Sequence, residues 1–112
     1  MERDVKFEGR EGALICAVGV EIDHHSAARI RRLIDEELFL KKPKVLILDL
    51  SAVRFMDSSG IALVLGRVET ARAVGATVRL VGLCDGIMKL VRLSGLDRVR
   101  DLSLLSSSGI GV

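Results

Sequence analysis

The sequence lacks tryptophan and tyrosine and has only three phenylalanines among 112 residues. Proteins that bind single-stranded nucleic acid stack its bases on aromatic side chains, so this scarcity argues against such a partner. An excess of charge of one sign is also lacking, because 17 basic residues stand against 15 acidic ones and the net charge is +2. Such a balance gives little attraction to nucleic acid or to an acidic membrane surface. We therefore expect no direct nucleic-acid partner and no membrane partner.

Long apolar runs are missing as well. The first residues, MERDVKFEGREG, are charged from the second position and contain no apolar signal core, and no later run approaches the length of a membrane span. The two cysteines, Cys16 and Cys84, are far apart and are interpreted as small core residues rather than a disulfide or a metal site. We expect a cytoplasmic protein without a cofactor or a metal ion.

What remains is the composition of an ordinary globular domain. Apolar residues make up 49% of the chain and charged residues 29%. A chain of 112 residues has the length of one domain, 1–112, and buries about two-thirds of its unfolded surface on folding. The last stretch, about 104–112, is rich in serine and glycine and is expected to be a flexible tail.

Apolar periodicity predicts elements in the order β-β-α-β-α-β-α-β. They are strands at 5–8 and 13–20 joined by a turn at 9–12, a helix from 27, a strand at 44–50, a helix from 60, a strand at 76–82, a helix at 84–95 and an edge strand at 97–102. The helix at 84–95 is expected to be capped by Asp85 and to end at Gly95. The apolar stripe of the helix from 60 is expected at Ile61, Val64, Leu65, Val68 and Ala71. Within the strand at 44–50, residues 45–48 form a continuous apolar run that Asp49 closes, which predicts a strand buried on both faces. The alternation indicates an α/β fold with a mixed, mostly parallel sheet of about five strands, opened by an N-terminal β-hairpin and covered by three or four helices.

Polar residues gather at two of the predicted strand-to-helix junctions. IDHH precedes the first helix, with Asp23 or Ser26 as the expected cap, and FMDSSG precedes the second. In a parallel sheet the carboxyl ends of neighbouring strands lie at the same edge. We therefore expect Asp23, His24 and Ser58 on one surface.

Ser58 has several possible roles at the second junction. Asp57, Ser58 and Ser59 can each cap a helix, which is a purely structural role. A helix start also tolerates a negative charge, so capping is compatible with accepting a phosphate. Catalysis is less favoured, because MDSSG lacks the first glycine of a nucleophile elbow and no oxyanion loop can be identified.

Gly60 follows the two serines inside the first turn of the predicted helix. A glycine there lowers helix stability by about 1 kcal/mol relative to alanine, which indicates that another backbone approaches it closely.

Two other kinds of site have weak support. His24 and His25 would point apart on a helix and could not easily chelate one ion. Asp49 ends a buried strand, as the phosphoacceptor of a receiver domain does, but the paired acid and the late lysine of such domains are missing. Arg67 is interpreted as part of a solvated helix face.

With IDHH at 22–25 and FMDSSGIALVLGR at 55–67, the sequence resembles the STAS-domain anti-sigma factor antagonists, and the adjacent histidines point to their sporulation branch. The resemblance extends over about residues 4–100 and implies the STAS fold. It also implies a protein that is a ligand and a substrate, not an enzyme. Members of the family bind an anti-sigma factor that is also a serine kinase and so release the sigma factor. The kinase phosphorylates the first serine of the motif, here Ser58, and a phosphoserine phosphatase resets the protein.

The resemblance further implies a partner-binding surface. Asp23 and His24 are expected to help form it, Asp57 and Ser59 to flank the phosphorylation site, and Gly60 to let the partner backbone approach. The alternative is a STAS interaction module of a stress or transporter-regulatory complex that phosphorylation at this serine does not control.

Overall fold

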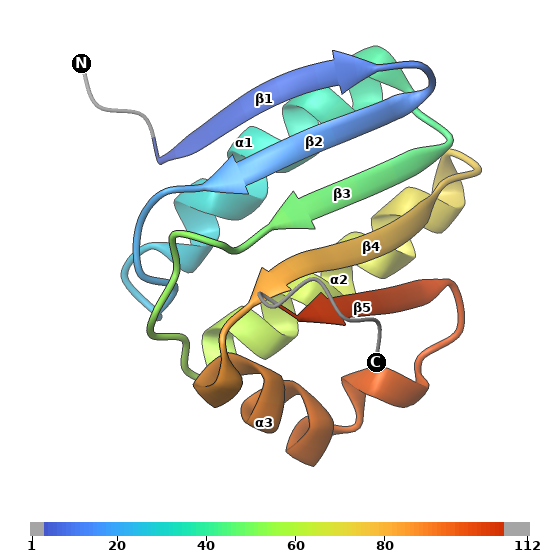
Figure 1. Ribbon diagram of the computed structural model, residues 1–112. Coiled ribbons are helices and arrows are strands. Elements are labelled where there is room, and N and C mark those ends of the chain that lie inside the picture. Colours follow the sequence, from blue (N-terminus) through green and yellow to red (C-terminus); the bar gives the residue numbers. More distant parts are fainter. Residues whose placement is uncertain (1–3, 107–112) are drawn as a thin grey trace.

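The computed structural model describes residues 4–106, which build a five-stranded sheet with helices packed against it (Figure 1). The elements are β1 (Val5–Arg10), β2 (Ala13–Val18), α1 (Ala27–Lys41), β3 (Val45–Asp49), α2 (Ser58–Ala73), β4 (Thr77–Leu83), α3 (Asp85–Ser94), a 3-10 turn (Leu96–Arg98) and β5 (Leu102–Ser106). In space the strands follow the order β1-β2-β3-β4-β5, with β1 antiparallel to β2 and every later pair parallel. The predicted fold class is confirmed.

The opening hairpin closes through a tighter turn than the predicted 9–12. Arg10 pairs with Ala13, so only Glu11 and Gly12 lie between the strands. Both have positive φ, 47° and 87°, as in the two-residue turn that matches the twist of paired strands. Glycine at the second position adopts this conformation without steric cost.

Helices α1 and α2 lie behind the sheet in Figure 1, on the same face. Parallel strands that follow one another in sequential order are joined by crossovers of one hand, which places the connecting helices on one side. The side chains of β2, β3 and β4 that point to this side are buried: Leu14, Cys16, Val18, Leu46, Leu48, Val78 and Leu80. The opposite side chains of β3, including Val45 and Ile47, are only half-buried. The expectation that β3 is buried on both faces is therefore wrong, because an apolar run does not show where the crossovers pass.

The two sheet-covering helices differ in how well their apolar positions were predicted. Helix α1 starts at Ala27, as expected, and buries a stripe at four-residue spacing: Ile30, Ile34 and Leu38. Helix α2 buries Leu63, which the predicted stripe left out, whereas Leu65 is 40% exposed. The sequence IALVL is apolar on every side of the helix, so periodicity alone cannot orient it.

The carboxyl-terminal elements depart from the predictions in two places. Cys84, rather than Asp85, is the N-cap residue of α3, and no side chain makes the cap hydrogen bond; Gly95 ends the helix with φ of 90°, as expected. The fifth strand is Leu102–Ser106, not 97–102, and two of those earlier residues, Asp97 and Arg98, belong to the 3-10 turn.

Register explains the displacement of the fifth strand. Leu102 pairs with Val78 and Leu104 pairs with Leu80, so two leucines of β5 match two buried residues of β4. The expected flexible tail, 104–112, thus begins inside a strand, and its residues 107–112 lie outside the described part of the chain.

Cys16 is fully buried and Cys84 half-buried, and both are free thiols. Burial, with a smaller contribution from the negative charge of Glu37, raises the pKa of Cys16 to about 12, so this thiol stays protonated. Within residues 4–106, no helix is both long enough and apolar enough to cross a membrane.

Candidate partner-binding surface

The two polar junctions are joined by backbone contacts beyond the ends of β2 and β3. Ile22 and Met56 form an isolated parallel bridge. The amide of Ile22 donates to the carbonyl of Phe55 at 3.2 Å, and the amide of Asp57 donates to the carbonyl of Ile22 at 3.1 Å. The residues just before His24 and just before Ser58 are thereby fixed against one another, so the expectation that both junctions share one edge of the sheet is confirmed.

At the start of α1, the polar side chains serve the local fold. The carboxylate of Asp23 accepts hydrogen bonds from the amides of His25 (2.8 Å) and Ser26 (3.1 Å). These bonds, the His25 amide first, lower the pKa of Asp23. The Ser26 hydroxyl donates to the carbonyl of Glu21 at 2.7 Å and accepts from the amide of Asp23 at 3.2 Å. Ser26 is only 6% exposed, so it closes the turn from inside.

At the start of α2, one polar side chain caps the helix and another is left unbonded. Asp57 is the N-cap residue, and its carboxylate accepts from the amide of Ser59 at 2.8 Å. Ser58 is the first residue of the helix and is exposed, and its hydroxyl makes no hydrogen bond with any residue in the range 4–106. The capping role is therefore filled by Asp57, and the oxygen of Ser58 faces solvent.

Gly60 has a different environment from the expected one. It is buried, and a β-carbon at this position would lie 2.0 Å from Cγ of Met56 and 3.2 Å from a methyl group of Ile22. The close approach that glycine permits is made by the chain's own side chains, not by an outside backbone. Since Met56 and Ile22 form the bridge between the junctions, Gly60 lets α2 start directly against that bridge.

The adjacent histidines do not point apart as predicted for a helix. His24 and His25 precede α1, and their ring centroids are 3.9 Å apart with the planes tilted by 39°. Both are exposed. The described residues nevertheless contain no group of three or more histidine, cysteine, aspartate and glutamate side chains that could hold a metal ion.

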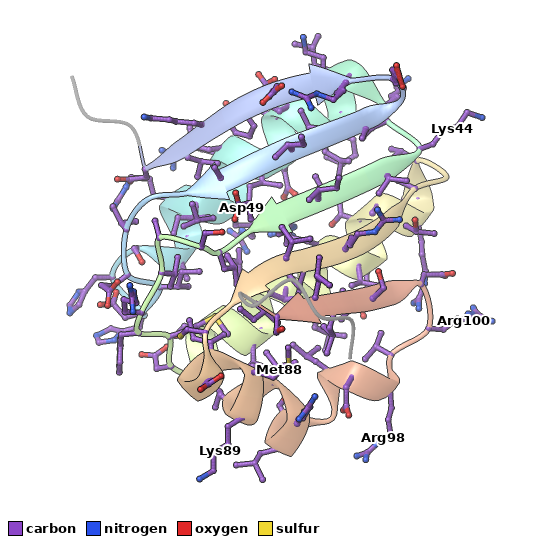
Figure 2. All side chains as sticks on the ribbon, in the orientation of Figure 1. Lys44, Asp49, Met88, Lys89, Arg98 and Arg100 are labelled. Carbon is purple, nitrogen blue, oxygen red and sulfur yellow. The ribbon has the colours of Figure 1, made fainter. Side chains whose placement is uncertain are left out.

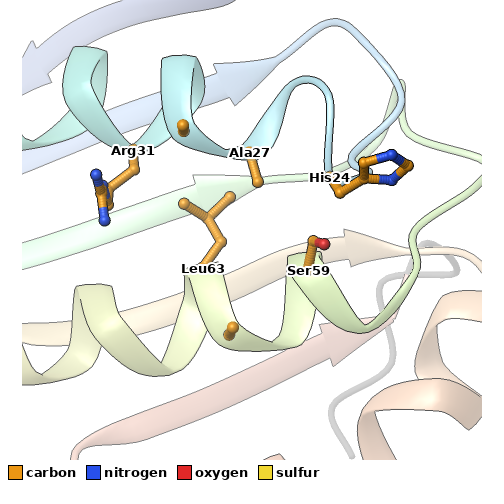
Figure 3. Close-up of a pocket in the computed structure, with 7 residues that line it drawn as sticks. His24, Ala27, Arg31, Ser59 and Leu63 are labelled. Carbon is orange, nitrogen blue, oxygen red and sulfur yellow. The ribbon is translucent and has the colours of Figure 1, made fainter.

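His24, just before α1, and Ser59, in the first turn of α2, lie on opposite sides of the amino-terminal end of a groove between the two helices (Figure 3). The groove has a volume of about 310 Å³ and continues over Ala27 and Arg31 of α1 and over Leu63 of α2. The sequence placed His24 near the motif serines, but the helical packing that forms a groove beside them is a tertiary feature.

Arg67 is not on a solvated face, and this interpretation is wrong. Its residue surface is 5% exposed, and its Nε lies 2.9 Å from a carboxylate oxygen of Asp35 on α1. Burial disfavours both charges, so it raises the pKa of Asp35 and lowers the pKa of Arg67. The attraction between the two charges acts in the opposite direction on each pKa but is the smaller effect. This ion pair links the two helices. It could not be predicted from the sequence around Asp35, because its partner lies on another helix.

Asp49 lies at the end of β3 on the face of the sheet away from α1 and α2 (Figure 2). Its carboxylate accepts hydrogen bonds from the amide of Ser51 at 3.0 Å and from the hydroxyl of Ser51 at 2.5 Å. Gly82, with φ of 74°, leaves the space for this turn, because a β-carbon there would lie 2.2 Å from the Ser51 hydroxyl oxygen. The carboxylate of Asp49 thus orders a turn, which is a structural role.

Comparison with known proteins identifies the family. The STAS domain family model matches residues 4–108. The anti-sigma F factor antagonist of Lysinibacillus sphaericus is 37% identical over 96 residues, which are 86% of this chain and 81% of that protein. The solved structure of the anti-sigma factor antagonist SpoIIAA in its unphosphorylated form is 28% identical with a TM-score of 0.74, covering 89% of this chain and 86% of that one. SpoIIAA of Bacillus in its phosphorylated form gives 28% identity and a TM-score of 0.66, with 89% of each chain covered.

The family match spans almost the whole chain, and the shared fold brings the two polar junctions to one edge of the sheet. On these grounds the chain belongs to the STAS-domain anti-sigma factor antagonists, a family of regulatory proteins rather than enzymes.

Proposed function

We propose that the unphosphorylated protein binds an anti-sigma factor that is also a serine kinase, and that phosphorylation of Ser58 ends this binding. Binding releases the sigma factor for transcription, and a phosphoserine phosphatase restores the active form. The relatives named above support the anti-sigma partner, and one of them has been solved in both an unphosphorylated and a phosphorylated form. A cytoplasmic location and a role in sporulation are part of the same proposal.

The observation that carries the proposal is the free hydroxyl of Ser58. It is exposed at the first position of α2, while Asp57 supplies the side-chain cap through the amide of Ser59. Modifying Ser58 therefore breaks no hydrogen bond that holds the described fold together. A helix start tolerates an added anion, so the phosphorylated protein is expected to stay folded.

The partner surface of this proposal comprises Asp23, His24, Asp57 and Ser59 around the acceptor. Gly60 is assigned an indirect part: it holds the start of α2 against Met56 and so sets the position of Ser58. A phosphate adds about −1.5 to −2 charges at neutral pH beside the carboxylate of Asp57. In a complex this charge must be desolvated next to that carboxylate, whereas in the free protein it remains in water.

The test starts with a pull-down that uses the Ser58→Ala variant as bait to capture the cognate anti-sigma factor. The captured kinase and ATP are then added to the unmodified protein, and tryptic peptides are mapped by mass spectrometry. Cleavage after Arg54 and Arg67 gives a peptide whose only serines are Ser58 and Ser59, and the serines of residues 103–108 fall in another peptide. We expect one phosphate, on Ser58.

A phosphate on Ser59 or in the carboxyl-terminal peptide would contradict the assignment. Capture of a partner without any phosphorylation would instead favour the interaction module that phosphorylation does not control. Ser59→Ala makes the mapping unambiguous, because it leaves Ser58 as the only serine of that tryptic peptide, so a phosphate that remains on the peptide must lie on Ser58.

A further inference from the structure

The groove beside Ser59 does not end at Leu63. A second hollow of about 460 Å³ shares Ala28 and Arg31 with the first and continues along the two helices to Phe39. One surface groove thus runs between α1 and α2 from the junctions to the last turns of α1. We call it the α1–α2 groove.

The α1 residues that line this groove recur with the period of the helix. The lining residues come in steps of four along one face of α1: Ala27 and Ala28, Arg31 and Arg32, Asp35 and Glu36, then Phe39. Small alanines at the start leave the space, and Phe39 at the far end is 50% exposed. The groove therefore offers apolar surface at both ends and charge in its middle.

The free charge in the middle of the groove is positive. Asp35 is occupied by Arg67 on the floor, at 2.9 Å. Arg31 and Arg32 are exposed, and no carboxylate in residues 4–106 forms an ion pair with either of them, whereas Arg29 on the same helix pairs with Asp4. Glu36 is the remaining acidic side chain of the lining. The two exposed guanidinium groups, of which Arg31 is also attracted by the carboxylate of Asp35, line this part of the groove without a direct ion pair. Each is able to bind a carboxylate through two parallel hydrogen bonds.

Arg67 adds a second observation. Its Nη1 is buried and has no hydrogen-bond partner among the described residues, although buried donors in native proteins are nearly always paired. Arg67 lines the second hollow, so this unpaired donor belongs to a residue of the groove lining.

We propose that the α1–α2 groove binds an acidic segment of a protein partner, with carboxylates on Arg31 and Arg32 and an apolar side chain against Phe39. Charge complementarity selects this occupant. The inference goes beyond the Ser58 switch, because occupation of the groove requires no phosphorylation. A nucleic-acid strand would also be attracted by the arginines, but the rings in the described lining are His24 and Phe39, at opposite ends of the groove, and they offer no continuous stack for successive bases.

The test is an amide NMR titration of the full chain with octaglutamate, with octalysine and the oligonucleotide dT8 as comparison probes. We expect octaglutamate to give saturable shifts that cluster on the groove-facing residues of α1 and α2, and to bind more weakly as salt rises. Octalysine should give no saturable shifts. Binding of dT8 as tight as that of octaglutamate would overturn the assignment to an acidic protein segment.

The variant Arg31→Gln/Arg32→Gln removes both free guanidinium groups and keeps long side chains on the helix. The matched control is Arg79→Gln/Arg98→Gln, which removes the same charge from exposed arginines on β4 and the 3-10 turn, outside the groove. We expect octaglutamate to bind the groove variant about tenfold more weakly and the control almost unchanged, with equal melting temperatures.

Equal loss in the two variants would show a non-specific charge effect and overturn the proposal, as would shifts spread over the whole surface. Neither result would touch the Ser58 switch, which is tested by phosphate mapping. Conversely, a failure to phosphorylate Ser58 leaves the expected peptide binding unchanged, so the two proposals fail separately.

Discussion

The starts of α1 and α2 are built from the same residue types and use them in opposite ways. Each has an aspartate whose carboxylate accepts backbone amides, and each has a serine close behind it. Ser26 is 6% exposed and bonded on both sides, whereas Ser58 is exposed and unbonded within the described residues. Since an aspartate accepts the amides at both helix starts, capping does not distinguish the two serines. A serine at a helix start is available for chemistry only when its own hydroxyl is not already bonded within the fold.

The sharpest test of this difference is a charge at Ser58. Ser58→Asp adds one negative charge at an exposed helix start, so the free energy of unfolding should be unchanged or slightly raised. Binding to the captured anti-sigma factor should weaken about a hundredfold, which corresponds to about 3 kcal/mol. Calorimetric titration measures the affinity, with a thermal melt for folding.

Ser58→Ala is the control for that variant. It should bind like the unmodified protein, lose less than about 0.5 kcal/mol of stability, and resist release by ATP. Full-strength binding by a folded Ser58→Asp protein would show that charge here is not the switch, and unfolding of Ser58→Ala would show that the serine is structural.

The second prediction concerns the packing that positions Ser58. Gly60→Ala places a methyl group into the side chain of Met56, which is itself 6% exposed. Overpacking of this kind should lower the free energy of unfolding by about 2–3 kcal/mol, as measured by urea denaturation. Gly66→Ala is the matched control, since nothing lies within 4 Å of its would-be β-carbon. A loss no larger than that of the control would mean that Met56 yields without strain.

The third prediction reverses the roles of the two serines. Ser26→Ala leaves the carbonyl of Glu21 and the amide of Asp23 without their hydroxyl partner. The expected cost is about 1–2 kcal/mol by urea denaturation, clearly above that of Ser58→Ala. If the two serine-to-alanine variants lose the same stability, the distinction drawn between the helix starts is mistaken.

The smallest expected effect is at Asp23 and appears at low pH. Hydrogen bonds from the amides of His25 and Ser26 lower the pKa of Asp23 from its ordinary value of 3.8. The folded state therefore binds this proton less readily than the unfolded state, so the stabilisation is present above pH 3.8 and is lost as the pH falls through the lowered pKa. In thermal melts recorded from about pH 5 downward, the stability of Asp23→Asn should therefore fall less steeply with decreasing pH than that of the unmodified protein.

The same variant also separates the local role of Asp23 from partner contact. Ser26, not Asp23, is the N-cap residue of α1, and the carboxylate of Asp23 accepts amides in the turn before the helix. The side-chain carbonyl oxygen of asparagine can accept the same hydrogen bonds, so most of the stability at neutral pH should be kept. Weaker binding to the anti-sigma factor in Asp23→Asn would then come from the partner surface. Normal binding would restrict Asp23 to the helix start.

Much of the fold followed from local patterns. The hairpin, the start of α1 at Ala27 and the stop at Gly95 were predicted because turn glycines, caps and apolar spacing act within a few residues. The meeting of the two junctions was predicted from the parallel topology alone. The prediction of the fifth strand was wrong because the position of this strand depends on which residues of β4 it pairs with. The sequence of the strand alone does not determine that register.

The sequence by itself determined which residues could act: Asp57, Ser58 and Ser59 at a helix start, next to His24 from another junction. Only the tertiary structure decided what each does. It buried Ser26 and left Ser58 free, set Gly60 against Met56, and paired Arg67 with Asp35 between the helices that flank the groove. The physical reason is that propensity and spacing are properties of a short segment, whereas burial and pairing depend on what another segment brings to the same place.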